Sequence, residues 1–401
     1  MLQARQRLRY LITFMFGVVI GWVVSHVPRA LGADRYATLE IFAKVLYQID
    51  QYYIEPVDIK ELIYGAVQGM VERLDPHSLF MPPDDYREVK EDTTGRFIGL
   101  GIEVAKKDGQ LIVVSPIEGS PAQRAGVKPL DQIVAIDGEP TLSMTLAEAV
   151  KRLRGPRGSR IELTFRRHGN PDPVPITLIR DHIHKRAVSG RMLNKTVGLI
   201  RIRSFQEKTA SETFSAISSL RAKGATGYVL DLRDNPGGLL DEAVAVSDLF
   251  IDDGVIVSIV SRTEPKVEVK RALPNSPFTI SPLVVLVNEG SASAAEIVAG
   301  ALKDLHRAVI VGARTFGKGT VQNMIELDDG SGLKLTIAKY LTPNGTNIHH
   351  VGIEPTVVVS ESEPDGPNGQ PTKATEDPFL DEAIRRLANW DQFKHAANQA
   401  G

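Results

Sequence analysis

One segment, residues 283–322, constrains the fold of this 401-residue chain more than any other. An apolar run of strand length ends in a glycine–serine turn, and apolar residues then recur at helical spacing, at positions 297, 298, 301, 302 and 305. A second apolar run, 308–312, leads to a lysine between two glycines. The segment therefore predicts a strand, a helix that begins at Ser293, and a second strand that ends shortly before Lys318.

The start of that helix is a favourable position for a nucleophile. Unpaired backbone N–H groups and the positive end of the helix dipole gather there, so a serine at position 293 has donors for an oxyanion nearby. A serine hydroxyl also needs a base, and the histidine of this segment, His306, lies at the far end of the predicted helix. We therefore take Lys318 as the candidate base and Gln322 as the residue that holds it.

A lysine that acts as a base near neutral pH needs a pKa about three units below its ordinary value of ~10.4. Burial in an apolar site, away from carboxylates, lowers the pKa of a lysine in this way. Gly317 and Gly319 allow the backbone beside Lys318 to pass close to another element. Taken singly, Ser293 is a helix cap and Lys318 a turn residue in most proteins, so the prediction rests on their joint order and spacing.

At these residues the chain resembles the carboxyl-terminal processing peptidases, a family also called tail-specific proteases. The resemblance rests on three boxes: GSASAAEI at 290–297, TFGKGTVQ at 315–322 and DLRDNPGG at 231–238. It implies that Ser293 is the nucleophile, Lys318 the general base and Gln322 its orienting partner.

The third box carries a further implication of the same resemblance. The backbone N–H of Gly238, with that of Ala294, is implied to form the oxyanion hole, and Gly237 is the alternative to Gly238.

Two other motifs are rejected on physical grounds. Residues 312–318 read G-x-x-x-x-G-K, as in a phosphate-binding loop, but Gly319 stands where that loop needs Ser or Thr, and the alternating residues that follow predict a strand. Residues 331–334 match the S-x-x-K of penicillin-binding enzymes, which requires a helix, whereas apolar residues alternate at positions 333, 335 and 337. These patterns disfavour an NTPase and a helical Ser–Lys site.

Composition excludes several chemistries. The chain has no cysteine, which rules out a thiol nucleophile, disulfides and zinc–thiolate sites. Its nine histidines form no H-E-x-x-H motif, and a net charge of −2 offers no basic field for nucleic acid. We therefore expect no metal, no cofactor and no nucleic-acid partner. The length and a hydrophobic content of 42% suffice for more than one domain.

Residues 1–33 have the layout of an export signal. Arginines at positions 5, 7 and 9 precede an apolar stretch at 11–24, and no acidic residue occurs before Asp34. Small residues at positions 30 and 32 offer a cleavage site for a signal peptide, while extension of the apolar stretch to position 27 favours a signal anchor in the membrane. Both alternatives stay open. Both predict an exported protein, in the periplasm or on the extracytoplasmic face of the inner membrane.

A helical region, 34–94, follows, with apolar residues at helical spacing as far as about residue 89 and a break at Asp75–Pro76. We expect it to serve as scaffold or dimerisation face. In the related family such a region contributes to assembly, which implies a homo-oligomer.

Residues 95–181 change to short strands with glycine turns, a pattern that resembles a PDZ domain. Gly99-Leu100-Gly101-Ile102 stands for the G-L-G-F loop of that family. The resemblance implies that backbone N–H groups of Leu100, Gly101 and Ile102 capture the terminal carboxylate of a peptide, which adds a strand to the sheet edge. A glycine-rich turn without a ligand is the alternative.

Residues 182–356 predict an α/β core with a partly parallel sheet. Buried strand candidates alternate there with helical stretches, the strands at 196–202, 226–232 and 282–287 and the helices at 209–223 and 239–250. The catalytic boxes fall at strand ends, where open α/β sheets usually place their sites. Residues 357–376 read as a flexible linker and 377–401 as a C-terminal helical segment.

The combined prediction is a multidomain α/β serine endopeptidase with a Ser–Lys dyad. It hydrolyses peptide bonds in exported proteins and selects these substrates by their free C-terminal tails. A catalytically inactive PDZ adaptor that holds tails without cutting them is the alternative function. An adaptor protein that assists the enzyme is a further candidate partner.

Overall fold

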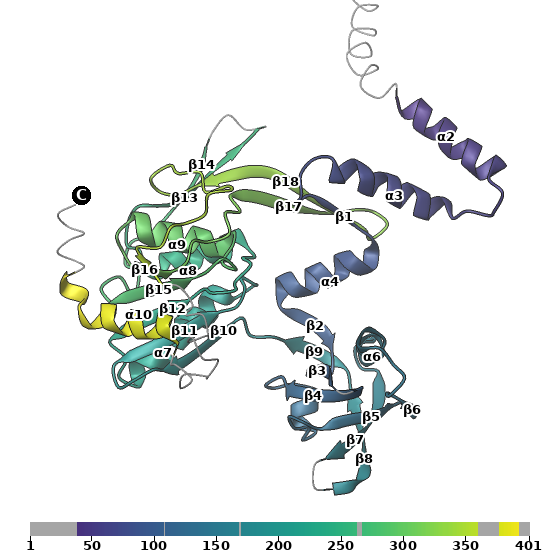
Figure 1. The fold of residues 1–401 in the computed structure, drawn as a ribbon, viewed down its shortest axis with the longest axis horizontal. Coiled ribbons are helices and arrows are strands. Elements are labelled where there is room, and N and C mark those ends of the chain that lie inside the picture. Colours follow the sequence, from purple (N-terminus) through teal and green to yellow (C-terminus); the bar gives the residue numbers. More distant parts are fainter. Residues whose placement is uncertain (1–37, 108, 168–169, 263–266, 360–376, 393–401) are drawn as a thin grey trace, which may run out of the picture. The chain divides into compact units, whose positions relative to one another are not determined.

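The computed structural model describes residues 38–392, apart from 108, 168–169, 263–266 and 360–376 (Figure 1). The predicted export segment, 1–33, lies outside the described residues, as does nearly all of the predicted linker. The linker prediction is wrong at its start, because residues 357 and 358 form a short strand, β19 (Val357–Val358). The chain divides into two compact units, Met1–Asp75 and Pro76–Gly401.

The described part of the first unit consists of two helices, α2 (Leu39–Tyr52) and α3 (Ile59–Glu72). Asp58 is the N-cap of α3, since its carboxylate accepts hydrogen bonds from the backbone N–H groups of Lys60 (2.7 Å) and Glu61 (3.4 Å). No residue of α2 is buried. Among the residues that the structure describes, none of the helices has the length and apolarity to cross a bilayer.

The second unit begins with a strand where the sequence predicts helix. β1 (Leu79–Met81) pairs antiparallel with β18 (Gly332–Leu341), and the helix α4 (Pro83–Thr94) begins only after it. Phe80 and Met81 are buried in this pairing. The expectation of helix is therefore wrong at residues 79–81, because local periodicity carries no information about a partner strand so distant in sequence.

The PDZ-like region is built on a sheet with the order β3-β4-β5-β7-β8, in which β6 pairs with β5. These strands are β3 (Ile102–Lys107), β4 (Gln110–Pro116), β5 (Gln132–Ile136), β6 (Glu139–Pro140), β7 (Arg160–Arg167) and β8 (Asn170–Ile179), with helices α5 (Pro121–Arg124) and α6 (Leu146–Leu153). A separate ladder joins β2 (Arg96–Gly99) to β9 (Asp181–His184). β2 and β3 are thus separate strands, divided at Leu100 and Gly101, and β3 is an edge strand of its sheet.

The α/β core contains a sheet with the order β10-β11-β12-β15-β16-β19, in which only β10 runs antiparallel to its neighbour. Its strands are β10 (Val188–Met192), β11 (Val197–Ile202), β12 (Gly227–Asp231), β15 (Leu283–Val287), β16 (Val309–Gly312) and β19. The central strands β12 and β15 are buried throughout because both faces of the sheet are covered, and every residue of β15 is apolar. The predicted class, multidomain α/β with a partly parallel sheet, is confirmed.

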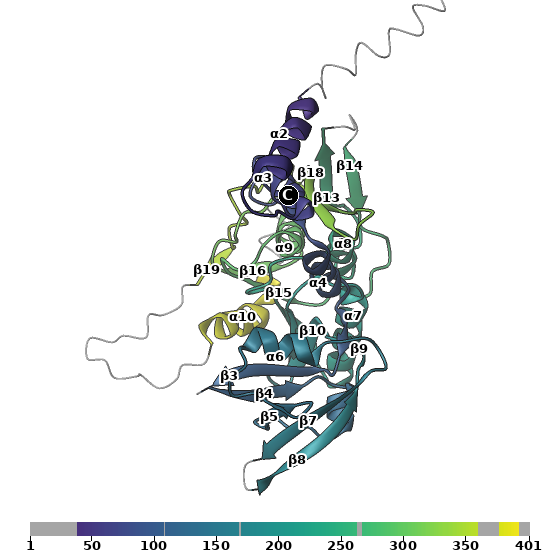
Figure 2. The same ribbon diagram turned by 90° about the vertical axis from the view of Figure 1, so that its right-hand side faces the viewer.

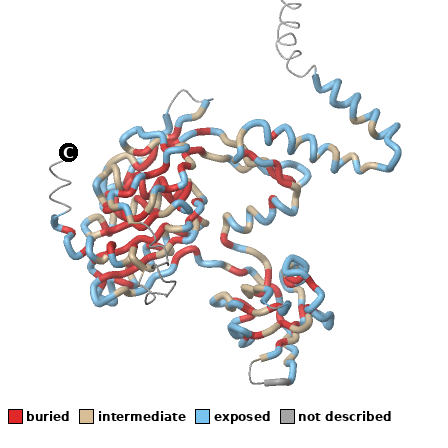
Figure 3. The backbone as a smooth tube through the Cα atoms, viewed as in Figure 1, coloured by how far each residue is buried: buried red, intermediate tan, exposed pale blue. Residues whose placement is uncertain are grey.

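One face of this sheet packs against α7 (Thr209–Ala222), α8 (Leu240–Asp248) and α9 (Ala294–Asp304), and the other face packs against α10 (Pro378–Ala388). Figure 2 shows α9 and α10 on opposite sides of β15 and β16. The buried residues concentrate in these layers (Figure 3). The helix α10 lies within the predicted C-terminal helical segment, and Asp377 caps it by accepting from the N–H of Phe379 at 3.1 Å.

A second sheet of the core has the order β1-β18-β13-β14, with β17 also paired to β18. It adds β13 (Val255–Ser261), β14 (Glu268–Arg271) and β17 (Thr320–Glu326). The segment after Lys318 is therefore a strand and not the helix of a phosphate-binding loop, and residues 332–334 are strand too. The strands β10, β13 and β14 are not predicted from the sequence. β10 and β14 are mostly exposed and lack an apolar run, whereas β13 is rich in valine and isoleucine and its strand signal was missed.

Candidate active site

Ser293 lies at the junction between the loop after β15 and the helix α9, as the sequence predicts. Its backbone has φ 55° and ψ −114°, a conformation that a residue with a side chain rarely adopts. Two hydrogen bonds hold the loop in place, from Ser291 Oγ to the carbonyl of Leu232 at 2.7 Å and from Ala292 N–H to the carbonyl of Asn235 at 2.9 Å. Strained backbone that the surroundings enforce is typical of functional sites.

The turn after β12 packs directly against this junction. A Cβ atom on Gly237 would lie 2.8 Å from Ser293 Cβ, and one on Gly238 would lie 2.1 Å from the carbonyl oxygen of Phe205. The carbonyl of Gly237 accepts a hydrogen bond from Phe205 N–H at 2.8 Å. Both positions therefore require glycine, since a side chain at Gly237 would collide with Ser293 and one at Gly238 would collide with the backbone of Phe205.

The two glycines of this turn differ in what their N–H groups do. Gly237 is buried and donates its N–H to Asn235 Oδ1 at 2.9 Å. Gly238 is exposed, and neither its N–H nor that of Ala294 has a hydrogen-bond acceptor among the described residues. This arrangement supports Gly238 over Gly237 as the oxyanion donor that acts together with Ala294.

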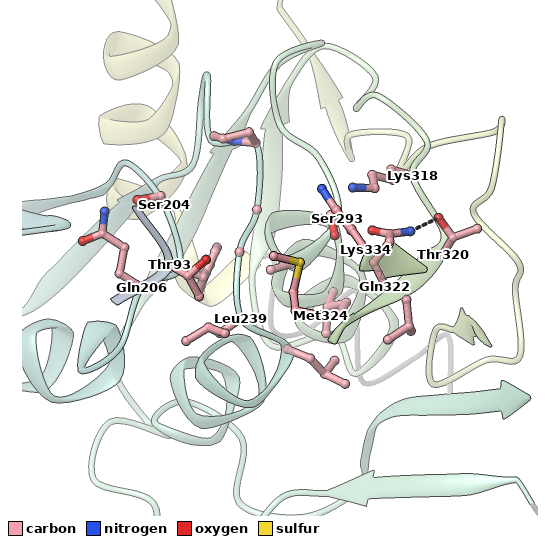
Figure 4. A pocket seen from close by; sticks show the side chains of 18 of the residues that line it. Thr93, Ser204, Gln206, Leu239, Ser293, Lys318, Thr320, Gln322, Met324 and Lys334 are labelled. Carbon is pink, nitrogen blue, oxygen red and sulfur yellow. Dashed lines mark hydrogen bonds between the residues drawn. The ribbon is translucent and has the colours of Figure 1, made fainter. Parts of the chain in front are cut away.

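Lys318 is positioned by the glycines on either side of it, in the loop between β16 and β17. A Cβ on Gly319 would lie 2.7 Å from the backbone nitrogen of His349, and Gly317, at φ 88°, accepts a hydrogen bond from His350 N–H at 2.8 Å. The close backbone approach expected for these glycines is therefore present. Figure 4 shows the side chain of Lys318 extending toward Ser293.

Gln322 stands beside them on β17. Its amide Nε2 donates to Thr320 Oγ1 at 2.8 Å and to Thr336 Oγ1 at 3.4 Å. With the nitrogen directed to these two hydroxyls, the carbonyl oxygen of the amide faces the side where Ser293 and Lys318 lie (Figure 4). An amide oxygen in this position is an acceptor for an ammonium group.

Sequence reasoning assigned no role to Glu296, although the residue belongs to the quoted box. Its side chain is fully buried and its carboxylate accepts four hydrogen bonds. Oε2 accepts from the N–H groups of Ser293 and Lys318, each at 2.8 Å. Oε1 accepts from Thr315 Oγ1 at 2.5 Å and from Gly317 N–H at 2.7 Å. One carboxylate thus fastens the nucleophile loop to the lysine loop, and the serine-x-x-glutamate spacing of a capping box is the sequence signal that was overlooked.

Tyr340 of β18 contacts the backbone carbonyl groups of the same two residues, Ser293 and Lys318. Sequence reasoning assigned no role to Tyr340 either. Its hydroxyl is shared between the carbonyl oxygen of Ser293, at 3.0 Å, and that of Lys318. Burial, and then the charge of Glu296, raise the pKa of this phenol well above its ordinary value, so the group stays protonated and remains a donor. No local pattern identifies such a residue, because its role depends on the packing of β18 beneath both loops.

These residues line a cavity of about 370 Å³. Ser293, Ala294, Gly238, Lys318 and Gln322 all contribute to its wall, so the structure brings together the predicted members of the site. The rest of the lining is mostly apolar and includes Phe205, Leu239, Leu240, Ile297 and Met324, with Val89, Asp92 and Thr93 from α4 (Figure 4).

The predicted peptide-binding loop lies apart in the sequence, between β2 and β3. The carbonyl of Leu100 accepts from Ala122 N–H at 3.0 Å, and that of Gly101 accepts from Ile117 N–H at 2.8 Å and from Ser120 Oγ at 3.2 Å. The N–H groups of Leu100 and Gly101 have no acceptor in the described part of the chain. Ile102 begins the edge strand β3. The loop thus offers open donors next to an open strand edge.

Three family models match the chain. Peptidase family S41 matches residues 196–359, a PDZ domain model matches 112–167, and the model described as activating protease CtpB N-terminal domain matches 27–85. The S41 match contains Ser293, Lys318 and Gln322, while the PDZ match begins after the loop at 99–102.

Two relatives are similar over most of the chain. The carboxy-terminal processing protease CtpA of Bacillus subtilis is 44% identical over 315 residues, which are 78% of this chain and 67% of the relative. A carboxy-terminal-processing protease of Bartonella bacilliformis is 40% identical over 89% of this chain and 84% of its own length. Among solved structures, a candidate S41 protease from Bacteroides fragilis aligns with a TM-score of 0.52 at 18% identity, over 86% of this chain and 94% of that chain, which supports the fold alone.

Proposed function

The chain belongs to peptidase family S41, with the carboxy-terminal processing proteases, and we propose that it is an endopeptidase that uses Ser293 and Lys318 as a catalytic dyad. The observation that carries the proposal is the buried carboxylate of Glu296, which accepts from the backbone N–H groups of both residues. A serine and a lysine that served only as a helix cap and a turn residue would not need this common support.

In the proposed reaction, neutral Lys318 takes the proton of the Ser293 hydroxyl as Oγ bonds to the carbonyl carbon of the substrate. The N–H groups of Gly238 and Ala294 donate to the oxyanion that forms. The peptide C–N bond then breaks while the Lys318 ammonium returns the proton to the leaving nitrogen. A water molecule releases the acyl group in a second round of the same steps, with Lys318 again as the base.

Gln322, Glu296 and Tyr340 act in this proposal as positioning residues. The amide oxygen of Gln322 orients the lysine, because its nitrogen is already directed to Thr320 and Thr336. Glu296 and Tyr340 hold the N–H and carbonyl groups of the dyad residues, so the distance between the two loops is set by buried contacts. Such support matters because proton transfer tolerates little displacement.

The PDZ domain is proposed to select substrates by their free C-terminal tails. The open N–H groups of Leu100 and Gly101, together with that of Ile102, would bind the terminal carboxylate while the tail pairs with the free edge of β3. Protein substrates are the partners that follow. An adaptor protein, a homo-oligomer, and export to the periplasm or the outer face of the inner membrane, with residues 1–33 as signal peptide or anchor, remain part of the same proposal.

The inactive adaptor is the second candidate and is not favoured. An adaptor that only holds tails gains nothing from a strained serine backbone or from two unpaired N–H groups beside it. The complete set of supporting contacts around Ser293 and Lys318 therefore favours the enzyme.

Incubation of the full chain with an unfolded peptide that carries an apolar, free-acid tail tests the proposal, with the products followed by mass. Internal cleavage that is absent in Ser293→Ala supports a serine endopeptidase. Binding of the peptide without any cleavage by the unmodified chain would instead identify an adaptor.

A further inference from the structure

Lys334 is a second lysine in the wall of the catalytic cavity. It belongs to the S-x-x-K sequence that strand geometry excludes as a catalytic motif, and it lies on β18, where it pairs with Met324 of β17 and Leu79 of β1. Figure 4 shows the side chains of Lys334 and Lys318 both reaching toward Ser293. Neither the catalytic steps above nor the positioning contacts give Lys334 a task.

The face of β18 that carries Lys334 also carries the residues that support the site. Side chains alternate along a strand, so Lys334 and Thr336 point to the same side, and beyond the irregularity at Ile337 the side chain of Tyr340 lines the same cavity as Lys334. Thr336 accepts from the amide of Gln322, and Tyr340 contacts the carbonyl groups of Ser293 and Lys318. Lys334 therefore belongs to the strand face on which the catalytic loops rest.

Lys334 is partly buried, and no carboxylate pairs with it among the described residues. Glu326 of the neighbouring strand β17 uses its carboxylate for another lysine, Lys90 of α4, at 2.8 Å. The positive charge of Lys334 therefore acts on the other charged groups at the cavity, and the mostly apolar lining strengthens that interaction.

The negative charge of Glu296 works against a neutral Lys318, and a positive charge in the cavity would compensate for it. Its carboxylate is required to hold the loops together, yet a negative charge beside Lys318 favours the ammonium form, which cannot act as a base. A second positive charge in the same cavity opposes this effect, because like charges disfavour one another's ionised forms.

We propose that Lys334 keeps Lys318 competent as a base by offsetting the charge of Glu296, and that it acts through Lys318 without touching the substrate. The proposal rests on the proposed function of Lys318. The other ionisable groups that face this region come from each element packed on the lysine loop: Tyr340 and Lys339 of β18, His349 and His350 after β18, and Asp92 of α4.

The test compares Lys334→Met, which removes the charge, with Lys334→Arg, which keeps it. The value of kcat/KM is measured from pH 6 to 10 on a tailed peptide that has no acidic residue near the cleaved bond. In Lys334→Met we expect the rising limb of the pH–rate profile to move on the order of one unit to higher pH, so that activity falls about tenfold near neutral pH and recovers in alkali. Lys334→Arg should keep the limb in place.

Lys223→Met is the matched control. Lys223 is exposed at the C-terminal end of α7 and does not line the catalytic cavity, so its removal changes the net charge equally and should move the limb much less. Equal shifts in the two methionine variants would overturn the proposal. So would a loss of the same size at every pH, which indicates a structural role, or a rise in KM without a shift, which indicates that Lys334 binds a substrate carboxylate.

A second measurement does not depend on activity. In a Ser293→Ala background, the rate at which an amine-acylating reagent modifies Lys318, read from the mass of its peptide, follows the fraction of neutral amine at each pH. The modification curve should move to higher pH with Lys334→Met, and an unmoved curve refutes the proposal. If Lys318→Met were to cleave normally, the proposed dyad would fail; if that variant is inactive and Lys334→Met leaves the limb in place, only the role of Lys334 fails.

Discussion

The loop at Leu100–Gly101 and the junction at Ser293 both leave two backbone N–H groups without an acceptor among the described residues, yet the two are built differently. The first is held by residues 117–122, which lie close by in the sequence. The second joins the start of α9 to the loop before β17 through the buried carboxylate of Glu296, while bonds from Ser291 and Ala292 tie the same junction to the turn after β12. The carboxylate of a substrate tail is only bound, so one local turn is enough to hold its donors. The oxyanion forms during a reaction, so its donors must also be fixed relative to a nucleophile and a base.

This difference predicts that changes at the catalytic junction lower turnover and leave tail capture intact, whereas changes at the tail loop do the reverse. Each experiment below therefore measures both cleavage and binding.

Removal of the nucleophile should give the largest effect. Ser293→Ala should lower kcat/KM by at least about a thousandfold, because the remaining donors cannot replace covalent catalysis. The fold should persist, since only one oxygen is lost, and a fluorescent tail peptide should bind as before. Cleavage at the parental rate would show that another residue is the nucleophile.

Replacement of the base should be nearly as damaging. Lys318→Arg keeps a positive charge of similar length, but a guanidinium does not release its proton in a protein, so the variant should be about as inactive as Lys318→Ala. Initial rates of peptide cleavage for both variants decide the point. Substantial activity in the arginine variant alone would mean that another group accepts the serine proton.

Glu296→Gln tests the support that distinguishes the two loops. The substitution turns one acceptor oxygen into a donor that faces backbone N–H groups, so we expect kcat/KM to fall about 100-fold and the free energy of unfolding to drop by about 1–3 kcal/mol. The exposed Glu289 of the same loop provides the control, Glu289→Gln, which should change neither quantity appreciably. Unchanged kcat/KM in Glu296→Gln would contradict the proposed role of the carboxylate.

The smallest effect is expected when the substrate loses the charge of its C-terminal carboxylate. Amidation of the substrate's C-terminus removes the charge that the N–H groups of Leu100 and Gly101 would bind, and should weaken capture by about 1.5–3 kcal/mol. The loss should appear as a higher KM with little change in kcat, measured on free-acid and amidated peptides of one sequence. Equal KM values would place tail recognition elsewhere in the molecule.

The sequence alone predicted the parts of the α/β core whose signals are local. A continuous apolar run marks β15 because both faces of that strand are covered, and a serine before apolar residues at helical spacing marks the start of α9. The glycines on either side of Lys318 predicted that the backbone there passes close to another element. The structure shows this, because the backbone of His349 lies against Gly319. The order of the three boxes identified the family that the comparisons support.

Tertiary structure decided the rest, because it depends on partners that no local pattern reveals. The strand β1 exists through its pairing with β18, against the helical expectation for that segment. Gly237 and Gly238 are adjacent in sequence, and their roles are separated by the burial of Gly237 and by its hydrogen bond to Asn235, whose amide is held by the carbonyl of Ile202. Glu296 and Tyr340 acquire theirs because α9 and β18 bring them beneath two loops that lie 25 residues apart (318 − 293), and a buried polar group is explained only by the groups it contacts.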